Sequence, residues 1–120
     1  VVIYALLPLD QEPVLIVPPH EALFCERDSW IKNIQVFPSA YPLQGVDAIT
    51  DTIRQLGLEE SRIGTELGGM FWLRMPHEDF TQLRQNLPRA DFVDASALLW
   101  QLRVCKSSAE IDLIRQAVAS

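Results

Sequence analysis

The chain has 120 residues, a formal net charge of −6, 48% apolar residues and 22% charged residues. A chain of this length and balance predicts one globular domain with a core of its own, and not a disordered segment. The acidic charge and the scattered Lys and Arg argue against nucleic acid as a partner. No apolar run reaches the roughly 18 residues that cross a bilayer.

The apolar opening of the chain lacks a basic leader and a small-residue cleavage site, so we predict no signal peptide. Cys25 and Cys105 lie far apart in the sequence and form no Cys-x-x-Cys pair. We therefore expect small, buried or half-buried free thiols in place of a disulfide or a metal site. These features together predict a cytoplasmic protein without a membrane partner.

The first third of the chain predicts strands. Residues 1–7 and 14–17 are apolar and β-branched, and a polar loop bounded by prolines separates them, which is typical of a hairpin. Both runs are apolar throughout, as in strands covered on both faces. Pro18 and Pro19 end the second strand, and a short helix is expected over 20–27. Residues 30–37 predict a third strand, because apolar and polar residues alternate from Ile34 to Val36.

A helix is predicted from residue 46, where one apolar stripe follows helical spacing: Val46, Ile49, Ile53 and Leu56. Gly57 is expected to end this helix in the left-handed conformation. Leu58 would then pack on Ile53, as in a Schellman ending.

Residues 62–67 predict a short buried strand, and a second helix is expected to begin with Pro76 as its first residue. Acidic residues follow in its first turn, Phe80, Leu83 and Leu87 form its apolar stripe, and Pro88 ends it. Residues 91–95 predict another strand.

Two further helices are expected. Asp94 or Ser96 is predicted to cap a helix through Trp100 to Arg103. Ser107 and Glu110 then form a capping box, followed by the stripe Ile111, Ile114 and Val118. This last helix reaches Ser120 without a stop signal, so we expect the natural protein to continue. Strands followed by alternating helices and strands indicate an α/β domain around a mixed sheet.

Residues that could carry chemistry show no convergent pattern. His20 and His77 each precede a glutamate but lack the second His of a zinc-binding His-Glu-x-x-His helix, so both are interpreted as surface or cap residues. Asp91 and Asp94 would point to opposite faces of a strand, which indicates a strand-entry residue and a helix cap. No catalytic and no metal-binding residue is assigned in this chain.

The remaining candidates favour structural roles. Gly68-Gly69 lacks the lysine of a phosphate-binding loop and predicts a turn. Trp30, Trp72 and Trp100 lie on different elements, and we expect mostly core or edge packing, the alternative being that one of them faces a ligand or partner.

The end of the chain carries a more specific pattern. Residues 102–111, with Ile114, Arg115 and Ala117, resemble the segment L-R-x-[IV]-K-[ST]-x-x-E-[IL]-x-x-[IL]-[RK]-x-A, which joins the two domains of creatinase, prolidase and aminopeptidase P. Residues 62–66 resemble the family's r-I-G-v-E strand, and residues 91–94 resemble its f-x-d strand. Cys105 replaces an aliphatic residue, Ser108 replaces a common proline, and the helix and strand that usually precede the hairpin do not appear.

This resemblance implies a ribonuclease H-like fold, with a mixed β-sheet flanked by helices. It implies that residues 1–104 form a creatinase/prolidase-type N-terminal domain and that residues 105–120 begin a linker helix toward an absent C-terminal catalytic domain. In the family's peptidases, two Asp, one His and two Glu of that second domain bind two divalent metal ions (Mn, Co or Zn). We carry over no nuclease residues.

The resemblance also implies a function. We expect a non-catalytic domain that serves oligomerisation, most often as a homodimer, and active-site closure in an Xaa-Pro dipeptidase or aminopeptidase with a peptide substrate. The alternatives are the N-terminal domain of a creatinase-type amidinohydrolase or of a lyase, a free-standing α/β module that binds a ligand or protein, and a small nuclease. Trp30 and Tyr41 are the candidates for an interface or a substrate rim, since exposed aromatic residues often anchor interfaces.

Overall fold

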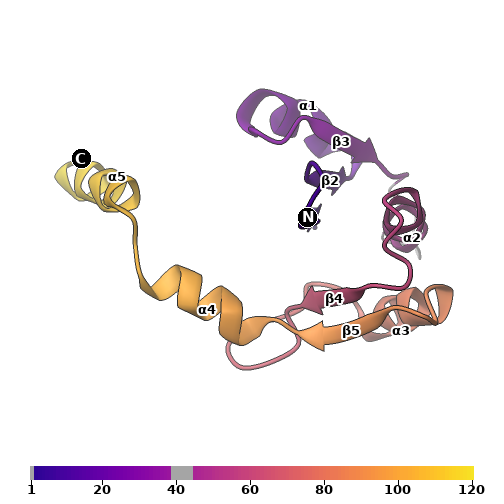
Figure 1. Cartoon of the computed structure of the whole chain (residues 1–120). Helices are drawn as coiled ribbons and strands as arrows, with labels where there is room; N and C mark the ends of the chain where they lie inside the picture. Colours follow the sequence, from indigo (N-terminus) through magenta and orange to yellow (C-terminus); the bar gives the residue numbers. More distant parts are fainter. Residues whose placement is uncertain (1, 39–44) are drawn as a thin grey trace. The chain divides into compact units, whose positions relative to one another are not determined.

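The computed structural model describes residues 2–38 and 45–120. In these residues the chain forms five strands and five helices (Figure 1). The chain divides into two compact units. The first unit comprises Val1–Ile63 and Arg74–Phe92, and the second comprises Gly64–Leu73 and Val93–Ser120. Each unit is described separately below.

The first unit contains a three-stranded sheet in the order β1-β2-β3. Its strands are β1 (Tyr4–Leu6), β2 (Val14–Val17) and β3 (Asn33–Val36). β1 and β2 are antiparallel, which confirms the predicted hairpin, whereas β2 and β3 are parallel. A parallel pair needs a crossover connection, and helix α1 (Pro19–Asp28) provides it. The sheet is therefore mixed, as expected.

The central strand β2 is buried along its whole length, as its apolar sequence predicted. Successive side chains of a strand point to opposite faces. Accordingly, Val14 and Ile16 belong to the larger apolar core, while Leu15 and Val17 belong to a smaller one with Ile31. Half-buried residues of α1 pack against the smaller core, so β2 is covered on both faces.

Helix α2 (Val46–Gln55) confirms the predicted stripe, with Val46, Ile49 and Ile53 buried. Its end is the predicted Schellman motif. Gly57 has a φ of 71°, its N–H donates to the Arg54 carbonyl at 2.9 Å, and the Leu58 N–H donates to the Ile53 carbonyl at 3.0 Å. Leu58 packs against the core that contains Ile53.

Helix α3 (His77–Asn86) buries Leu83, and Leu87 directly follows it with 2% of its surface exposed. Pro76 is the N-cap residue and not the first helical residue, because its ψ of 147° is extended. That prediction was one residue too early. Helix α3 packs against α2, and its Phe80 ring meets the Phe92 ring edge-on at 5.6 Å.

Strands β4 (Arg62–Thr65) and β5 (Asp91–Asp94) form a separate two-stranded sheet, and Figure 1 shows them running in the same direction. The boundary between the two units falls within both strands. The strand predicted over 62–67 is confirmed as β4, two residues shorter, but its predicted burial was wrong, since β4 alternates between exposed and half-buried residues. The reason is that β4 has a single neighbouring strand in its sheet.

The second unit contains α4 (Ser96–Val104) and α5 (Ser108–Ala119). The capping box of α5 is confirmed. The Ser107 hydroxyl accepts from the Glu110 N–H at 3.3 Å, and the Glu110 carboxylate accepts from the Ser107 N–H at 2.7 Å. Both bonds are local, so the start of α5 is specified by its own sequence. The two units together confirm the expected class, a mixed α/β protein with small sheets flanked by helices.

Candidate functional site

The two residues predicted at an interface have different outcomes. Trp30 lies between α1 and β3 and has 76% of its surface exposed. Tyr41 lies outside the described residues. The first unit also exposes Leu23 and Phe24 on α1, and the Arg27 guanidinium lies 5.4 Å from the centre of the Phe24 ring. The interface role of Trp30 and Tyr41 stays a prediction.

The tryptophans are less buried than expected. Trp72 is 81% exposed, so core or edge packing was the wrong expectation for it, whereas the exposure of Trp30 agrees with its choice as an interface candidate. Trp100 is half-buried, its indole N–H donates to the Gly69 carbonyl at 3.0 Å, and its ring meets Phe71 at 5.3 Å. Trp100 therefore joins α4 to the loop that follows β4.

Four residues of the second unit, which we call the Asp94 cluster, hold the same loop: Leu67, Gly68, Asp94 and Ser96. One Asp94 carboxylate oxygen accepts from the Leu67 N–H at 3.2 Å, the Ser96 N–H at 2.9 Å and the Ser96 hydroxyl at 2.6 Å. The Ser96 oxygen, in a residue only 3% exposed, also accepts from the Gly68 N–H at 3.0 Å. The cluster thus joins the loop after β4 to the start of α4, with Ser96 as its buried member.

The cluster combines two sequence predictions. Hydrogen bonds from the Ser96 hydroxyl and backbone hold the pKa of Asp94 below its usual value. A Cβ on Gly68 would collide with the Asp94 carboxylate. Gly68 lies in the predicted turn. Asp94 was a predicted cap of α4, and its carboxylate does accept from the first N–H of that helix, but the N-cap residue itself is Ala95. The sequence did not show that these two features contact each other.

The loop held by the cluster presents apolar side chains to solvent. Met70 has a φ of 64°, which is uncommon for a residue with a Cβ, and is 84% exposed. Trp72 follows two residues later. The two helices of this unit also expose large apolar residues: Leu98, Leu102, Val104, Ile111, Leu113, Ile114 and Val118. The stripe predicted for α5 therefore lies uncovered among the described residues.

The cysteines are both free. Cys25 is half-buried against the smaller core of the first unit, as expected. Cys105 is exposed, which corrects the expectation of a buried or half-buried thiol. Its position between α4 and α5, where every residue from 101 to 120 is exposed, explains the difference.

Two buried oxygens of the first unit lack a hydrogen-bond partner within the described residues, the Tyr4 hydroxyl and one Asp79 carboxylate oxygen. Burial, and secondly the negative charge of Asp79, raise the pKa of Tyr4. Tyr4 therefore stays protonated near neutral pH, and its hydroxyl is a donor facing an acidic neighbour. Buried polar groups of this kind are commonly bridged by water.

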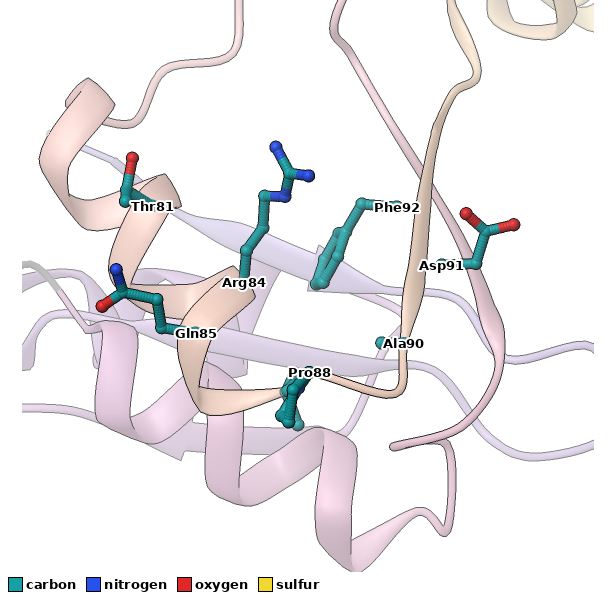
Figure 2. A pocket seen from close by; sticks show the side chains of 8 residues that line it. Thr81, Arg84, Gln85, Pro88, Ala90, Asp91 and Phe92 are labelled. Carbon is teal, nitrogen blue, oxygen red and sulfur yellow. The ribbon is translucent and has the colours of Figure 1, made fainter.

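A pocket of about 360 Å³ lies between α3 and the chain leading into β5 (Figure 2). We call it the α3–β5 pocket, and its lining is Thr81, Arg84, Gln85, Leu87, Pro88, Ala90, Asp91 and Phe92. Figure 2 shows the Arg84 and Phe92 side chains extending into the same opening from the helix and the strand, while the Asp91 carboxylate points away from them. Asp91 pairs with Arg62 at 3.5 Å.

The arrangement of the His, Cys, Asp and Glu side chains indicates whether the described residues could bind a metal ion. Within residues 2–38 and 45–120, no group of three or more His, Cys, Asp or Glu is arranged to hold a metal ion. His20 is exposed on α1, and His77 is exposed at the start of α3. The family resemblance implies its pair of divalent ions in a second domain, so the donor groups of this chain do not test that expectation.

The fold defines a mixed α/β domain. Comparison with protein families then matches residues 2–105 to the Creatinase/Prolidase N-terminal domain. The match covers most of the 120 residues, and the chain belongs to this family. A search of curated proteins found no match. In the part of the chain that the structure describes, no helix has the length and apolar character needed to span a membrane.

Proposed function

We propose that this chain is the non-catalytic N-terminal domain of an enzyme of the creatinase/prolidase family, serving subunit assembly and closure over an active site in a following domain. The observation that carries the proposal is the family match over residues 2–105. The first choice for the parent enzyme is an Xaa-Pro dipeptidase or aminopeptidase. The divalent metal pair of such an enzyme belongs outside this chain in our proposal.

The exposed helices of the second unit support a role in protein contact. Helix α5 has a complete capping box, so its start is well specified, yet its apolar residues Ile111, Ile114 and Val118 are 39%, 52% and 82% exposed. Large exposed apolar patches in a folded protein commonly mark contact surfaces. We therefore propose that α5 packs against a following catalytic domain.

The catalytic part of the proposal is tested with two proteins. The purified 120-residue chain, supplied with Mn²⁺ or Co²⁺ and an Xaa-Pro dipeptide, should show no turnover. The natural gene, read beyond the Ser120 codon, should encode two Asp, one His and two Glu in a second domain, and its full-length product should hydrolyse the dipeptide. Hydrolysis by the 120-residue chain, or a stop codon directly after Ser120, would contradict the proposal.

The assembly part is tested by sedimentation of the full-length protein, which we expect to be a homodimer. Trp30→Ala and Tyr41→Ala should weaken the dimer, because buried aromatic side chains often dominate interface energies. Leu9→Ala is the matched control, since Leu9 is fully exposed and no role is assigned to it. A dimer that is unchanged by both aromatic substitutions would remove these residues from the interface.

A further inference from the structure

The α3–β5 pocket lies wholly within the first unit and has one charged and one apolar side. Its apolar lining comes from Pro88, Ala90 and Phe92, above the buried Leu87. Phe92 is half-buried, and its ring is held by the edge-on contact with Phe80. The lining thus combines polar and apolar groups, and about 360 Å³ lies at the lower end of the size range of small-molecule sites.

Arg84 gives the pocket its charge. Within the described residues, no carboxylate lies within ion-pair distance of Arg84, and its guanidinium instead lies 5.9 Å from the centre of the Phe80 ring. Two nearby arginines differ in this respect. Arg62 pairs with Asp91, and Arg89 pairs with Glu59 and Glu60. The acid lining the pocket is thus already paired, and Arg84 keeps its charge available.

The hydrogen-bonding groups of the pocket, like the positive charge of Arg84, favour a negatively charged ligand. The Thr81 hydroxyl already donates to the His77 carbonyl at 2.9 Å. The Arg84 guanidinium, which lines the same pocket, is left to donate to a ligand. A guanidinium binds a carboxylate through two parallel hydrogen bonds, and both groups are planar.

We propose that the α3–β5 pocket binds a small organic carboxylate with an apolar body. The carboxylate pairs with Arg84, and the apolar body lies over Pro88 and Phe92. The same chemistry is offered by a free aromatic or aliphatic acid and by the C-terminal residue of a peptide. This site is independent of the enzyme role proposed above, since it uses no catalytic or interface residue.

The test is a heteronuclear NMR titration of the 120-residue chain with benzoate, using benzamide as the neutral compound of the same shape. Benzoate should give saturable shifts at the Arg84 side chain and at the amides of Ala90 and Phe92. Benzamide should bind about tenfold or more weakly, because it loses the charge-assisted hydrogen bonds. A peptide ending in phenylalanine, with a free or an amidated C-terminus, then distinguishes the two sources of the carboxylate.

Variants localise the binding. Arg84→Gln should weaken benzoate binding by about tenfold, and Arg84→Lys should weaken it less, because a lysine keeps the charge and loses the paired donors. Arg27→Gln is the control, as Arg27 is an exposed arginine of the same unit on α1. The NMR spectrum of each variant reports its fold directly. Equal binding of benzoate and benzamide, or unchanged binding by Arg84→Gln, would overturn the proposal.

Discussion

The two units of this chain are stabilised in different ways. The first unit has continuous apolar cores in which Ile16 of β2, Ile53 of α2 and Leu87, directly after α3, are 2% exposed or less. The second unit buries few apolar side chains, and its most buried described residue is Ser96. Its loop is held to α4 by the hydrogen bonds of the Asp94 cluster and by the Phe71–Trp100 contact.

The contrast separates two sources of stability. Apolar burial contributes about 25 cal/mol for each Å² removed from water, and a net hydrogen bond contributes about 1 kcal/mol. The first unit therefore has the means to fold without a partner, whereas the apolar surface of α4 and α5 gains stability when a protein covers it. Four predictions test this contrast, from the largest expected effect to the smallest.

Ile53→Ala should destabilise the first unit by about 3 kcal/mol, since it removes buried methyl groups and leaves a cavity. Urea unfolding followed by circular dichroism measures this. The matched control is Ile114→Ala on α5, where the side chain is 52% exposed and the expected change is below about 0.5 kcal/mol. Equal effects at both positions would show that α5 is as well packed as α2.

Gly68→Ala should loosen the second unit by about 2 kcal/mol, because the new Cβ would collide with the Asp94 carboxylate. Faster hydrogen exchange of the Leu67 and Gly68 amides, relative to the wild type, is the expected result. Gly69→Ala is the control, since a Cβ at Gly69 meets nothing within 4 Å. If both variants exchange at the same rate, the close approach at Gly68 does not hold the loop.

Ser107→Ala should destabilise the start of α5 by about 1 kcal/mol, because it removes the acceptor for the Glu110 N–H. The Glu110 amide should then exchange faster. Ser108→Ala leaves the capping box intact and serves as the control. An unchanged exchange rate in Ser107→Ala would mean that contacts other than the cap hold the first turn of α5.

Lowering the pH should weaken the hydrogen bonds of the Asp94 cluster more than it weakens the apolar packing of the first unit. The pKa of Asp94 is lowered from its ordinary value of 3.8 by hydrogen bonds from Ser96, so its contribution is complete above that value and is lost as the pH falls through the folded-state pKa. The indole N–H resonance of Trp100 should report the change. Asp94→Asn should remove this pH dependence, and a variant that keeps it would assign the titration to another group.

Much of the fold was predictable because it depends on residues near each other in the chain. The Schellman end of α2 joins Leu58 to Ile53, and the capping box joins Ser107 to Glu110. The apolar sequence of β2 likewise predicted burial on both faces. The partial exposure of β4 was not predictable, because the burial of a strand depends on how many strands and helices cover it.

The candidate sites were less visible in the sequence. Trp30 was expected on the surface as an interface candidate, but the exposure of Trp72 and the contact of Gly68 with Asp94 were not expected. The sequence did not predict the α3–β5 pocket either, because Arg84 comes from a helix and Phe92 from a strand. An arginine four residues after Phe80 on one helix face is the single local signal that the sequence offered.

The sequence by itself determined the helix ends, the hairpin, the apolar stripes and the family pattern at residues 102–117, because each rests on short-range hydrogen bonds or on side-chain periodicity. Only the tertiary structure decided which apolar stripes are covered, which arginine is left without a carboxylate, and which turn meets Asp94. The physical reason is that burial and ion pairing depend on distances between segments far apart in the chain. Those distances are set by the packing of β2, α2 and α3 in one unit and of the loop on α4 in the other.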